Sequence, residues 1–346
     1  MSVFPRSVFR SLSVLCLLAL AGCASLRPAA EPVAVTGVAY HSMVWQAKVA
    51  RLPEGVTAQT LQQLLQRRLD EANAVLSTYQ PDTELMRLNR APVGEWVALS
   101  PLLADTLAQA LEVSAATGGA YDVTVGPLVN LWGFGPQGRV TRAPAEEDIQ
   151  RARALVGWHG LALDRDGRRA RRLRPVLLDL SSAGEGAGSD VMAATLESLG
   201  VTDYLVGVAG SLRARGLKAD GQPWRLAIEQ PDGSGLPSRS LDLRDAAIST
   251  SGSYRNYFEQ DGVRYSHTID PASGRPISHR GVSVTVVLPG GSDTLADAWA
   301  TGLNVLGPDR GLALAERLGL AVCYIERTDG GFRARESSAF TRLSRP

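Results

Sequence analysis

The segment from Asp293 to Thr301 places a carboxylate and a hydroxyl at a spacing that suits metal binding. Asp297 and Thr301 are four residues apart, so on a helix their side chains lie on one face. Together they suit a hard cation such as Mg²⁺, which prefers oxygen ligands. The alternative is a Thr hydroxyl that bonds back along its own helix beside a solvated Asp.

A glycine-rich segment follows an apolar run and carries two acids. Gly184, Gly186 and Gly188 crowd this stretch, with Asp179 and Glu185 on either side of the expected turn. A strand that leads through such a turn into a helix can present backbone amides to a phosphate. A Rossmann fingerprint does not fit, because its third glycine is missing and no flanking βαβ repeats are present. We therefore expect a tight turn that needs positive φ.

Two further segments contribute aromatic rings and a histidine. Residues 119–135 hold three aromatic residues and four glycines in a chain that is only 6% aromatic. Such a loop could pack a planar ring against backbone, and the alternative is a hydrophobic corner of the core. His267, at the end of a strand, precedes the turn signal Asp270-Pro271. It could move a proton near neutral pH, and the alternative is a structural histidine.

Hydrophobic periodicity predicts the elements that position these segments. We expect helices at 58–76, 101–116, near 146–155, and at 190–199, 294–306 and 310–318. We expect strands at 175–180, 204–208, 224–228, 241–249, 264–269 and 282–288. This order predicts a mixed α+β fold.

The N-terminal residues predict that the protein is exported and anchored by a lipid. A short basic head and the apolar run 11–21 form a signal-peptide core. The run ends in Leu20-Ala21-Gly22-Cys23, which has the form of a lipobox, so Cys23 is the expected lipidation site. The alternative is an ordinary signal peptide with an incidental cysteine. We divide the chain into a signal peptide at 1–22, a lipidated Ala- and Pro-rich tether at 23–35 and one folded domain at 36–346.

Composition excludes several other classes of protein. The net charge is +1 and the basic residues are scattered, so nothing indicates nucleic-acid binding. The cysteine spacing fits neither zinc nor an iron–sulfur cluster. After signal cleavage only Cys23 and Cys323 remain, which leaves no internal disulfide if Cys23 is lipidated. Cys323 lies in an apolar run and is expected to be a buried small hydrophobe. No second segment is long and apolar enough to cross a membrane.

Taken together, the four segments resemble the ApbE family of FAD:protein FMN transferases, from about Ala39 to the C-terminus. The motifs that carry the resemblance are residues 121–136, 249–257, 267–271 and Gly274-Arg275-Pro276. The resemblance implies one large α+β domain of two lobes with an FAD cleft between them.

The resemblance also assigns roles to individual residues. It implies FAD contacts at Tyr40, Tyr79, Ala120, Tyr121, Asp122, Asp179, Glu185 and Ile269. It implies Mg²⁺ ligands at the Ser182 carbonyl, Asp297 and Thr301. Three positions depart from the usual pattern: Glu185 stands where many members have Lys, Ala187 where an aromatic is usual, and Ala300 where some members have a second Asp.

The activity implied is Mg²⁺-dependent transfer of FMN from FAD to a Thr or Ser hydroxyl of an acceptor flavoprotein, with release of AMP. His267 or a nearby carboxylate would act as base, and Asp297 would be essential. The expected acceptor is a subunit of a respiratory membrane complex with a periplasmic Thr or Ser. The protein would face the periplasm from a lipid anchor, and Ala24 after the lipobox cysteine favours the outer membrane. Two alternatives remain open: an FAD pyrophosphatase that uses water, and a non-catalytic FAD-binding lipoprotein.

Overall fold

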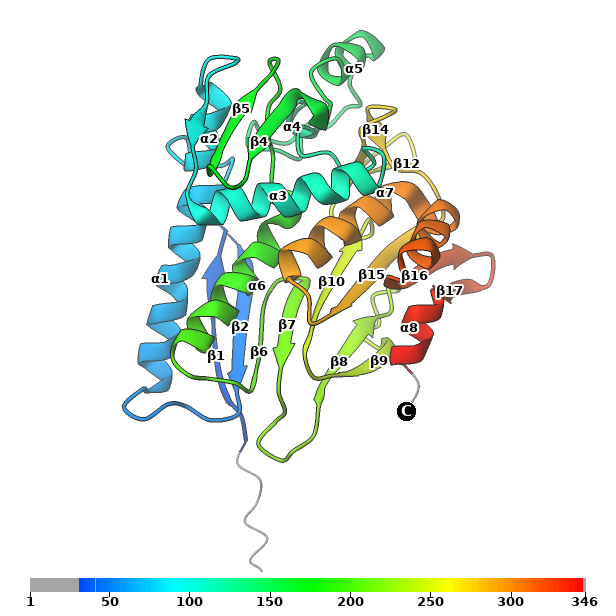
Figure 1. The fold of residues 1–346 in the computed structure, drawn as a ribbon. Coiled ribbons are helices and arrows are strands. Elements are labelled where there is room, and N and C mark those ends of the chain that lie inside the picture. The colour runs from blue at the N-terminus through cyan, green and yellow to red at the C-terminus, as the bar shows by residue number, and fades with distance from the viewer. Residues whose placement is uncertain (1–30, 41, 345–346) are drawn as a thin grey trace, which may run out of the picture.

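An eight-stranded antiparallel sheet is the centre of the computed structural model, which describes residues 31–40 and 42–344 (Figure 1). β6 and the long strand β15 are buried almost throughout, because both faces of the sheet are covered there. In sheet order the strands are β1 (Val33–Ala39), β2 (Met43–Val49), β6 (Tyr204–Val208), β7 (Ser211–Arg215), β10 (Ala246–Gly252), β15 (Gly281–Pro289), β16 (Ala321–Thr328) and β17 (Gly331–Glu336).

Long helices cover one face of this sheet (Figure 1). They are α1 (Ala58–Leu76), α6 (Ser181–Ser198), α7 (Asp293–Leu318) and α3 (Pro101–Ala116), which lies across α7. The sequence predicts the bounds of α1 and α3 correctly, because both have strong start signals. Thr57 and Thr60 form a capping box ahead of α1, and Ser100 caps α3 directly before Pro101.

α7 consists of two helical parts with a break at Gly307, which agrees with the two helices that the sequence predicts. Gly307 has φ 75° and ψ 171°, and Pro308 follows it. Proline lacks the amide that would bond the carbonyl four residues earlier, which here belongs to Asn304. The Nε2 atom of His279 lies 2.7 Å from that carbonyl, so its N–H donates in place of the missing amide. The kink therefore leaves no backbone acceptor unpaired at Asn304.

On the opposite face, the part of the sheet from β6 to β16 is covered by the hairpin of β8 (Trp224–Glu229) and β9 (Pro237–Leu243) and by α8 (Ser338–Leu343). Trp224 and Phe340 pack there with Cys323, which is 1% exposed. Burial raises the pKa of the Cys323 thiol to about 12, so this cysteine is the buried small hydrophobe that the sequence predicts.

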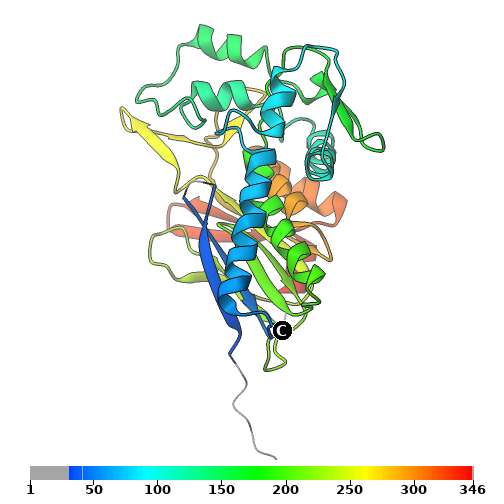
Figure 2. The ribbon, with the colours of Figure 1, turned by 90° about the vertical axis from the view of Figure 1, so that its left-hand side faces the viewer.

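The short elements form a separate group next to the sheet and the long helices, at the top of Figures 1 and 2. Rings of Trp132, Phe134, Phe258 and Tyr265 stack on one another there. The short elements are α2 (Glu84–Arg90), β3 (Val97–Ala98), α4 (Gly126–Leu131), α5 (Glu146–Arg153), the 3-10 turn η1 (Trp158–Gly160), β4 (Leu161–Asp164), β5 (Arg169–Arg172), β11 (Tyr257–Gln260), β12 (Val263–Ser266), β13 (Ile269–Asp270) and β14 (Arg275–Pro276).

The glycine-rich segment is helical, which corrects the expectation of a turn with positive φ. Gly184, Gly186 and Gly188 all lie within α6, and none of them has a positive φ. Gly186 is required for packing instead, because a Cβ there would lie 2.2 Å from the Asp293 carbonyl oxygen of α7. Tertiary packing overrides the local preference of glycine for turns.

Other boundaries also differ from the expectations. The folded body begins at Val33 and not at residue 36, so the end of the expected tether belongs to β1. The segment 241–249 is divided between β9 and β10, and 264–269 is divided between β12 and β13. Residues 175–180 form only an isolated bridge from Leu177 to Val125. The signal peptide and Cys23 lie outside the described residues.

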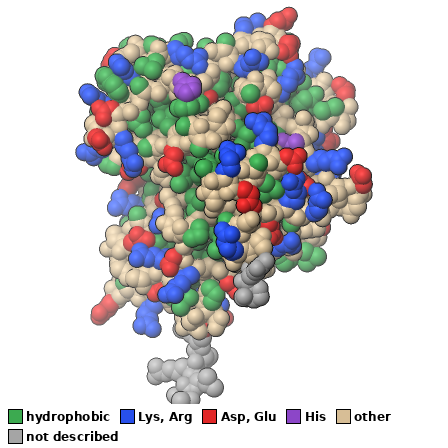
Figure 3. Space-filling view, turned by 45° about the vertical axis from the view of Figure 1, so that its right-hand side comes forward, with side chains coloured by type: hydrophobic (Ala, Val, Ile, Leu, Met, Phe, Trp, Pro, Cys, Tyr) green, Lys and Arg blue, Asp and Glu red, His purple; other side chains and the backbone are tan. Residues whose placement is uncertain are grey.

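Basic and acidic side chains are interspersed on the face drawn in Figure 3. Among the described residues, no helix is long and apolar enough to cross a membrane.

Candidate active site

Asp297 lies where α7 meets the beginning of α6. Its carboxylate is 8% exposed and accepts hydrogen bonds from the Gly186 amide at 3.0 Å and the Ser249 hydroxyl at 3.3 Å. Burial and the neighbouring Glu185 carboxylate raise the pKa of Asp297 well above its usual range. The expected alternative of a solvated Asp is therefore wrong.

Two further predicted residues converge on Asp297. Glu185 accepts a hydrogen bond from the Gly210 amide at 3.0 Å, and burial raises its pKa. The Tyr40 hydroxyl is buried without a hydrogen-bond partner and lies over Gly188 of α6. Burial, with the charges of Glu185 and Asp297, raises the pKa of Tyr40. This junction therefore gathers negative charge and an unsatisfied hydroxyl in a poorly hydrated place.

Ser182 belongs to the first turn of α6, one turn before Gly186. The Gly186 amide donates to Asp297 Oδ2 at 3.0 Å, so the first turns of α6 approach the same carboxylate. Thr301 follows Asp297 by one turn of α7 and is partly exposed.

These oxygen donors fit a hard divalent cation. Among the described residues, no ion pair involves Asp297 or Glu185, so their charges are not balanced by Lys or Arg. A cation held by the Asp297 carboxylate, the Thr301 hydroxyl and the Ser182 carbonyl would balance them. Residues 31–40 and 42–344 contain no cluster of three Asp, Glu, His or Cys side chains that could hold a metal. A cation at this junction would therefore be held partly by neutral oxygens.

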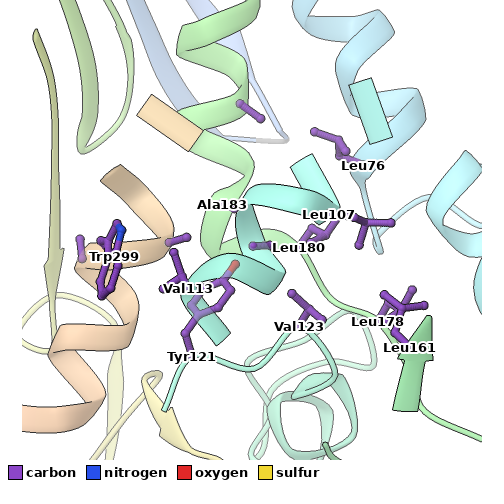
Figure 4. Close-up of a cluster of buried hydrophobic side chains, with 14 of the residues drawn as sticks. Leu76, Leu107, Val113, Tyr121, Val123, Leu161, Leu178, Leu180, Ala183 and Trp299 are labelled. Carbon is purple, nitrogen blue, oxygen red and sulfur yellow. The ribbon is translucent and has the colours of Figure 1, made fainter. Parts of the chain in front are cut away.

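Tyr121, Asp122 and Asp179 build the wall next to this junction. Tyr121 is 1% exposed, and its oxygen accepts from the Ser182 hydroxyl at 3.3 Å. Figure 4 shows it among buried apolar side chains near Ala183 at the start of α6. Asp122 accepts from Thr124 and from the Trp158 amide, and Asp179 accepts from the amide and hydroxyl of Ser181.

The Asp122 carboxylate therefore holds its own loop in place, and the Asp179 carboxylate holds the first residue of α6. A contact of Asp122 with a nucleotide would involve its backbone. Ala120 directly precedes Tyr121 and Asp122 in the same loop and is partly exposed.

Tyr79 and His267 lie beside the stacked rings of Trp132, Phe134, Phe258 and Tyr265, and both contact Phe134. The Tyr79 side chain is 48% exposed and its hydroxyl donates to the Phe134 carbonyl at 3.1 Å. Burial, and then the Asp179 charge, raises the pKa of Tyr79. His267 Nδ1 lies 3.1 Å from the Asn256 carbonyl, and its ring meets Phe134 edge-on with centroids 6.3 Å apart.

Because a carbonyl can only accept, Nδ1 of His267 carries the proton and Nε2 is left as the basic atom. Burial lowers the pKa of His267, which keeps this atom unprotonated at neutral pH.

The structure does not join all the predicted residues into one cluster. Among the described residues, no hydrogen bond connects His267 with Asp297. The Ile269 side chain is 5% exposed and packs with Leu128, Trp132 and Ile149, so a ligand contact there would use its backbone. Two hollows on the described surface lie elsewhere, one on β1 and β2 and one beside β9 and β17. The FAD cleft between two lobes therefore stays a prediction.

Several residues at the junction are missing from the sequence prediction. Ser249 and Gly210 contact Asp297 and Glu185, and Asp190 binds the first residues of α7. Ser249 begins one of the motifs that carry the resemblance, but the partners of all three residues are distant in sequence, so no local pattern indicates their contacts. Asn304 lies two turns after Asp297, and its Oδ1 atom is buried without a hydrogen-bond partner. Because residues seven apart lie on one face of a helix, this spacing is the sequence feature that could have indicated Asn304.

Comparisons with known proteins assign this architecture to a class. The model of the ApbE family matches residues 37–324. The FAD:protein FMN transferase of Vibrio cholerae is 43% identical over 328 residues, covering 94% of this chain and 95% of the relative.

Solved structures agree with this match. A histidine-to-glycine variant of flavin transferase ApbE from Vibrio cholerae has a TM-score of 0.82 at 42% identity, covering 91% of this chain and 100% of that chain. Flavinyl transferase ApbE from Pseudomonas stutzeri, in its apo form, has a TM-score of 0.82 at 41% identity, covering 91% and 97%. The fold is thus that of the flavin transferases, a mixed α+β domain. The chain belongs to the ApbE family.

Proposed function

We propose that this protein transfers the FMN half of FAD to a Thr or Ser hydroxyl of an acceptor flavoprotein, with Mg²⁺ bound at the α6–α7 junction. Family membership supports flavin transfer. The observation that supports this chemistry is the buried Asp297–Glu185 pair at the α6–α7 junction, which no Lys or Arg among the described residues neutralises.

The proposed reaction is a phosphoryl transfer. The acceptor oxygen forms a bond to the FMN phosphorus, the bond from that phosphorus to the AMP oxygen breaks, and AMP leaves. The main needs of such a step are positioning and neutralisation of charge. When bound, Mg²⁺ supplies positive charge that stabilises the pyrophosphate and the leaving AMP.

The residues of this chain have separate roles in that step. Asp297, Thr301 and the Ser182 carbonyl hold the metal. Tyr40, Tyr79, Glu185 and the backbone at Ala120, Asp122 and Ile269 line the nucleotide, with Tyr121 and Asp179 fixing the wall. Nε2 of His267 takes the proton of the acceptor hydroxyl, because its lowered pKa keeps it unprotonated.

The compartment and the partner are part of the proposal. The lipobox ending at Cys23 supports a lipid anchor on a periplasm-facing membrane surface, with Ala24 favouring the outer membrane. The acceptor would then be a respiratory membrane subunit with a periplasmic Thr or Ser.

The test mixes the purified protein with FAD and a candidate acceptor domain, with Mg²⁺ or with EDTA. Intact acceptor mass and released AMP are followed together. An acceptor heavier by one FMN, with equimolar AMP and only when metal is present, supports the proposal. AMP and free FMN without a labelled acceptor would make the protein a pyrophosphatase, and intact bound FAD would make it a carrier.

A further inference from the structure

The carboxylate of Asp190 makes an unusual set of contacts with another helix. It projects from α6, and its side chain is 20% exposed. Oδ1 accepts from the Asp293 amide at 3.0 Å and pairs with Arg213 at 2.7 Å. Oδ2 accepts from the Thr294 amide at 2.9 Å, the Thr294 hydroxyl at 2.8 Å and the Ser292 hydroxyl at 2.6 Å.

These donors belong to the first turn of α7. The first amides of a helix have no partner within it, and a carboxylate near them is stabilised by the helix dipole. Ser292 is the N-cap of α7 and already accepts from the Leu295 amide. Asp190 supplies the acceptor for the two preceding amides, those of Asp293 and Thr294. One carboxylate from α6 therefore fixes the start of α7 in both position and direction.

The candidate metal ligands follow directly along this helix. Asp297 is one turn beyond Asp293, and Thr301 is one turn further. Gly186 of α6 lies against the Asp293 carbonyl and donates to Asp297. A rotation or shift of the first turn of α7 would therefore move Asp297 relative to Ser182. Arg213 of β7 adds a third attachment, since it ties Asp190 to the sheet.

We infer that Asp190 is a positioning residue, which holds the first turn of α7 and thereby sets Asp297 and Thr301 for cation binding. The inference rests on the proposed function for the identity of the cation. Residues that orient metal ligands typically change metal affinity by 10- to 100-fold when they are replaced.

The test compares Asp190→Asn with Glu197→Gln in the full-length chain. Glu197 is a matched control, because it also lies on α6 and also pairs with an arginine of β7, Arg215, at 2.8 Å. It bonds Tyr204 in addition, and within residues 31–40 and 42–344 no hydrogen bond or ion pair joins it to α7. Mn²⁺ binding is measured directly by titration with paramagnetic detection, at saturating FAD.

We expect Asp190→Asn to weaken Mn²⁺ binding by about tenfold or more, and Glu197→Gln to change it by less than about twofold. In the transfer assay, the Mg²⁺ concentration for half-maximal rate should rise by a similar factor, while the rate at saturating Mg²⁺ falls much less. Wild-type Mn²⁺ affinity in a folded Asp190→Asn variant would overturn the inference.

A second variant and a second measurement cover other outcomes. If Asp190→Asn does not fold, Thr294→Val removes one hydroxyl donor and should weaken Mn²⁺ binding by a smaller factor in the same direction; an unchanged affinity there counts against the inference. Hydrogen exchange at the amides of residues 293–297 should accelerate in Asp190→Asn without any metal. If the wild type binds no Mn²⁺, the metal assignment of the proposed function fails, and the exchange rates alone decide the role of Asp190.

Discussion

The two candidate catalytic residues, Asp297 and His267, are held in very different ways. Asp297 sits between two long helices whose backbones touch at Gly186, and its helix is fixed by Asp190. His267 follows a short hairpin and has one carbonyl partner and one edge-on ring contact. Charge neutralisation needs fixed geometry, whereas a proton acceptor on a loop can adjust to the incoming hydroxyl. In the proposed reaction, the rigid region would serve the pyrophosphate and the looser one the acceptor hydroxyl.

The largest effect is expected for Asp297→Asn, which keeps the shape of the side chain and removes its charge. Loss of a charged metal ligand costs several kcal/mol of transition-state stabilisation, or about a thousandfold in rate. The melting temperature should stay the same or rise, because the variant removes a buried charge that Glu185 repels. Transfer rates and calorimetry check both parts, and full activity at millimolar Mg²⁺ would exclude Asp297 as a ligand.

His267→Ala should slow transfer by about a hundredfold, which is within the usual range for a general base. Because burial lowers the pKa of His267 below the ordinary 6.5, the wild-type rate should fall only as the pH drops below that value and the base becomes protonated. The variant should lose this acidic limb of the pH–rate profile. A limb that persists in His267→Ala would assign the base to another group.

Gly186→Ala should destabilise the protein by about 1–3 kcal/mol, the usual cost of overpacking. Its Cβ would lie 2.2 Å from the Asp293 carbonyl oxygen and 2.7 Å from the Thr294 amide nitrogen, so α6 and α7 would have to separate. Gly184→Ala is the control, since nothing lies within 4 Å of a Cβ there, and it should be neutral or slightly stabilising. Equal unfolding free energies for both variants in urea would show that the contact between the helices is not tight.

The smallest effect is expected for Tyr79→Phe. This change keeps the ring and removes the hydroxyl that donates to the Phe134 carbonyl. One such hydrogen bond contributes about 1 kcal/mol, so the KM for FAD should rise by no more than about fivefold with kcat nearly unchanged. A loss of kcat beyond tenfold would give the Tyr79 hydroxyl a direct part in the chemistry.

The sequence predicts local features of the fold well and non-local ones poorly. The bounds of α1 and α3 follow from apolar spacing and capping residues, which act within a few positions. Whether the glycine-rich segment forms a turn or a helix depends on its packing against Asp293, which is more than 100 residues away. The Asp293 carbonyl leaves no room for a side chain at Gly186. The strand expected at 241–249 failed because a turn at Arg244 and Asp245 divides it between two sheets.

The same distinction applies to the candidate site. Asp297 and Thr301 could be paired because their spacing is a property of one helix. The contacts that bury Asp297, from Gly186 and Ser249, come from two other elements. The resemblance indicated Tyr40 and Glu185, but no pattern could show that the Tyr40 hydroxyl would be left without a partner beside two carboxylates. The capping role of Asp190 has no local signal.

The pairing of β2 with β6 has a consequence for the order in which the chain assembles. Trp45 of the first hairpin pairs with Val208, and all the elements from α1 to α6 lie between them in the sequence. During synthesis, one edge of that hairpin therefore keeps its amides and carbonyls open until β6 has been made. Tyr40 enters with this hairpin and Asp297 comes only with α7, so the two ends of the site can meet only after α7 has been made. Contacts of such long sequence separation slow folding, and a chain that ends before α7 has an incomplete site, whatever it has already folded.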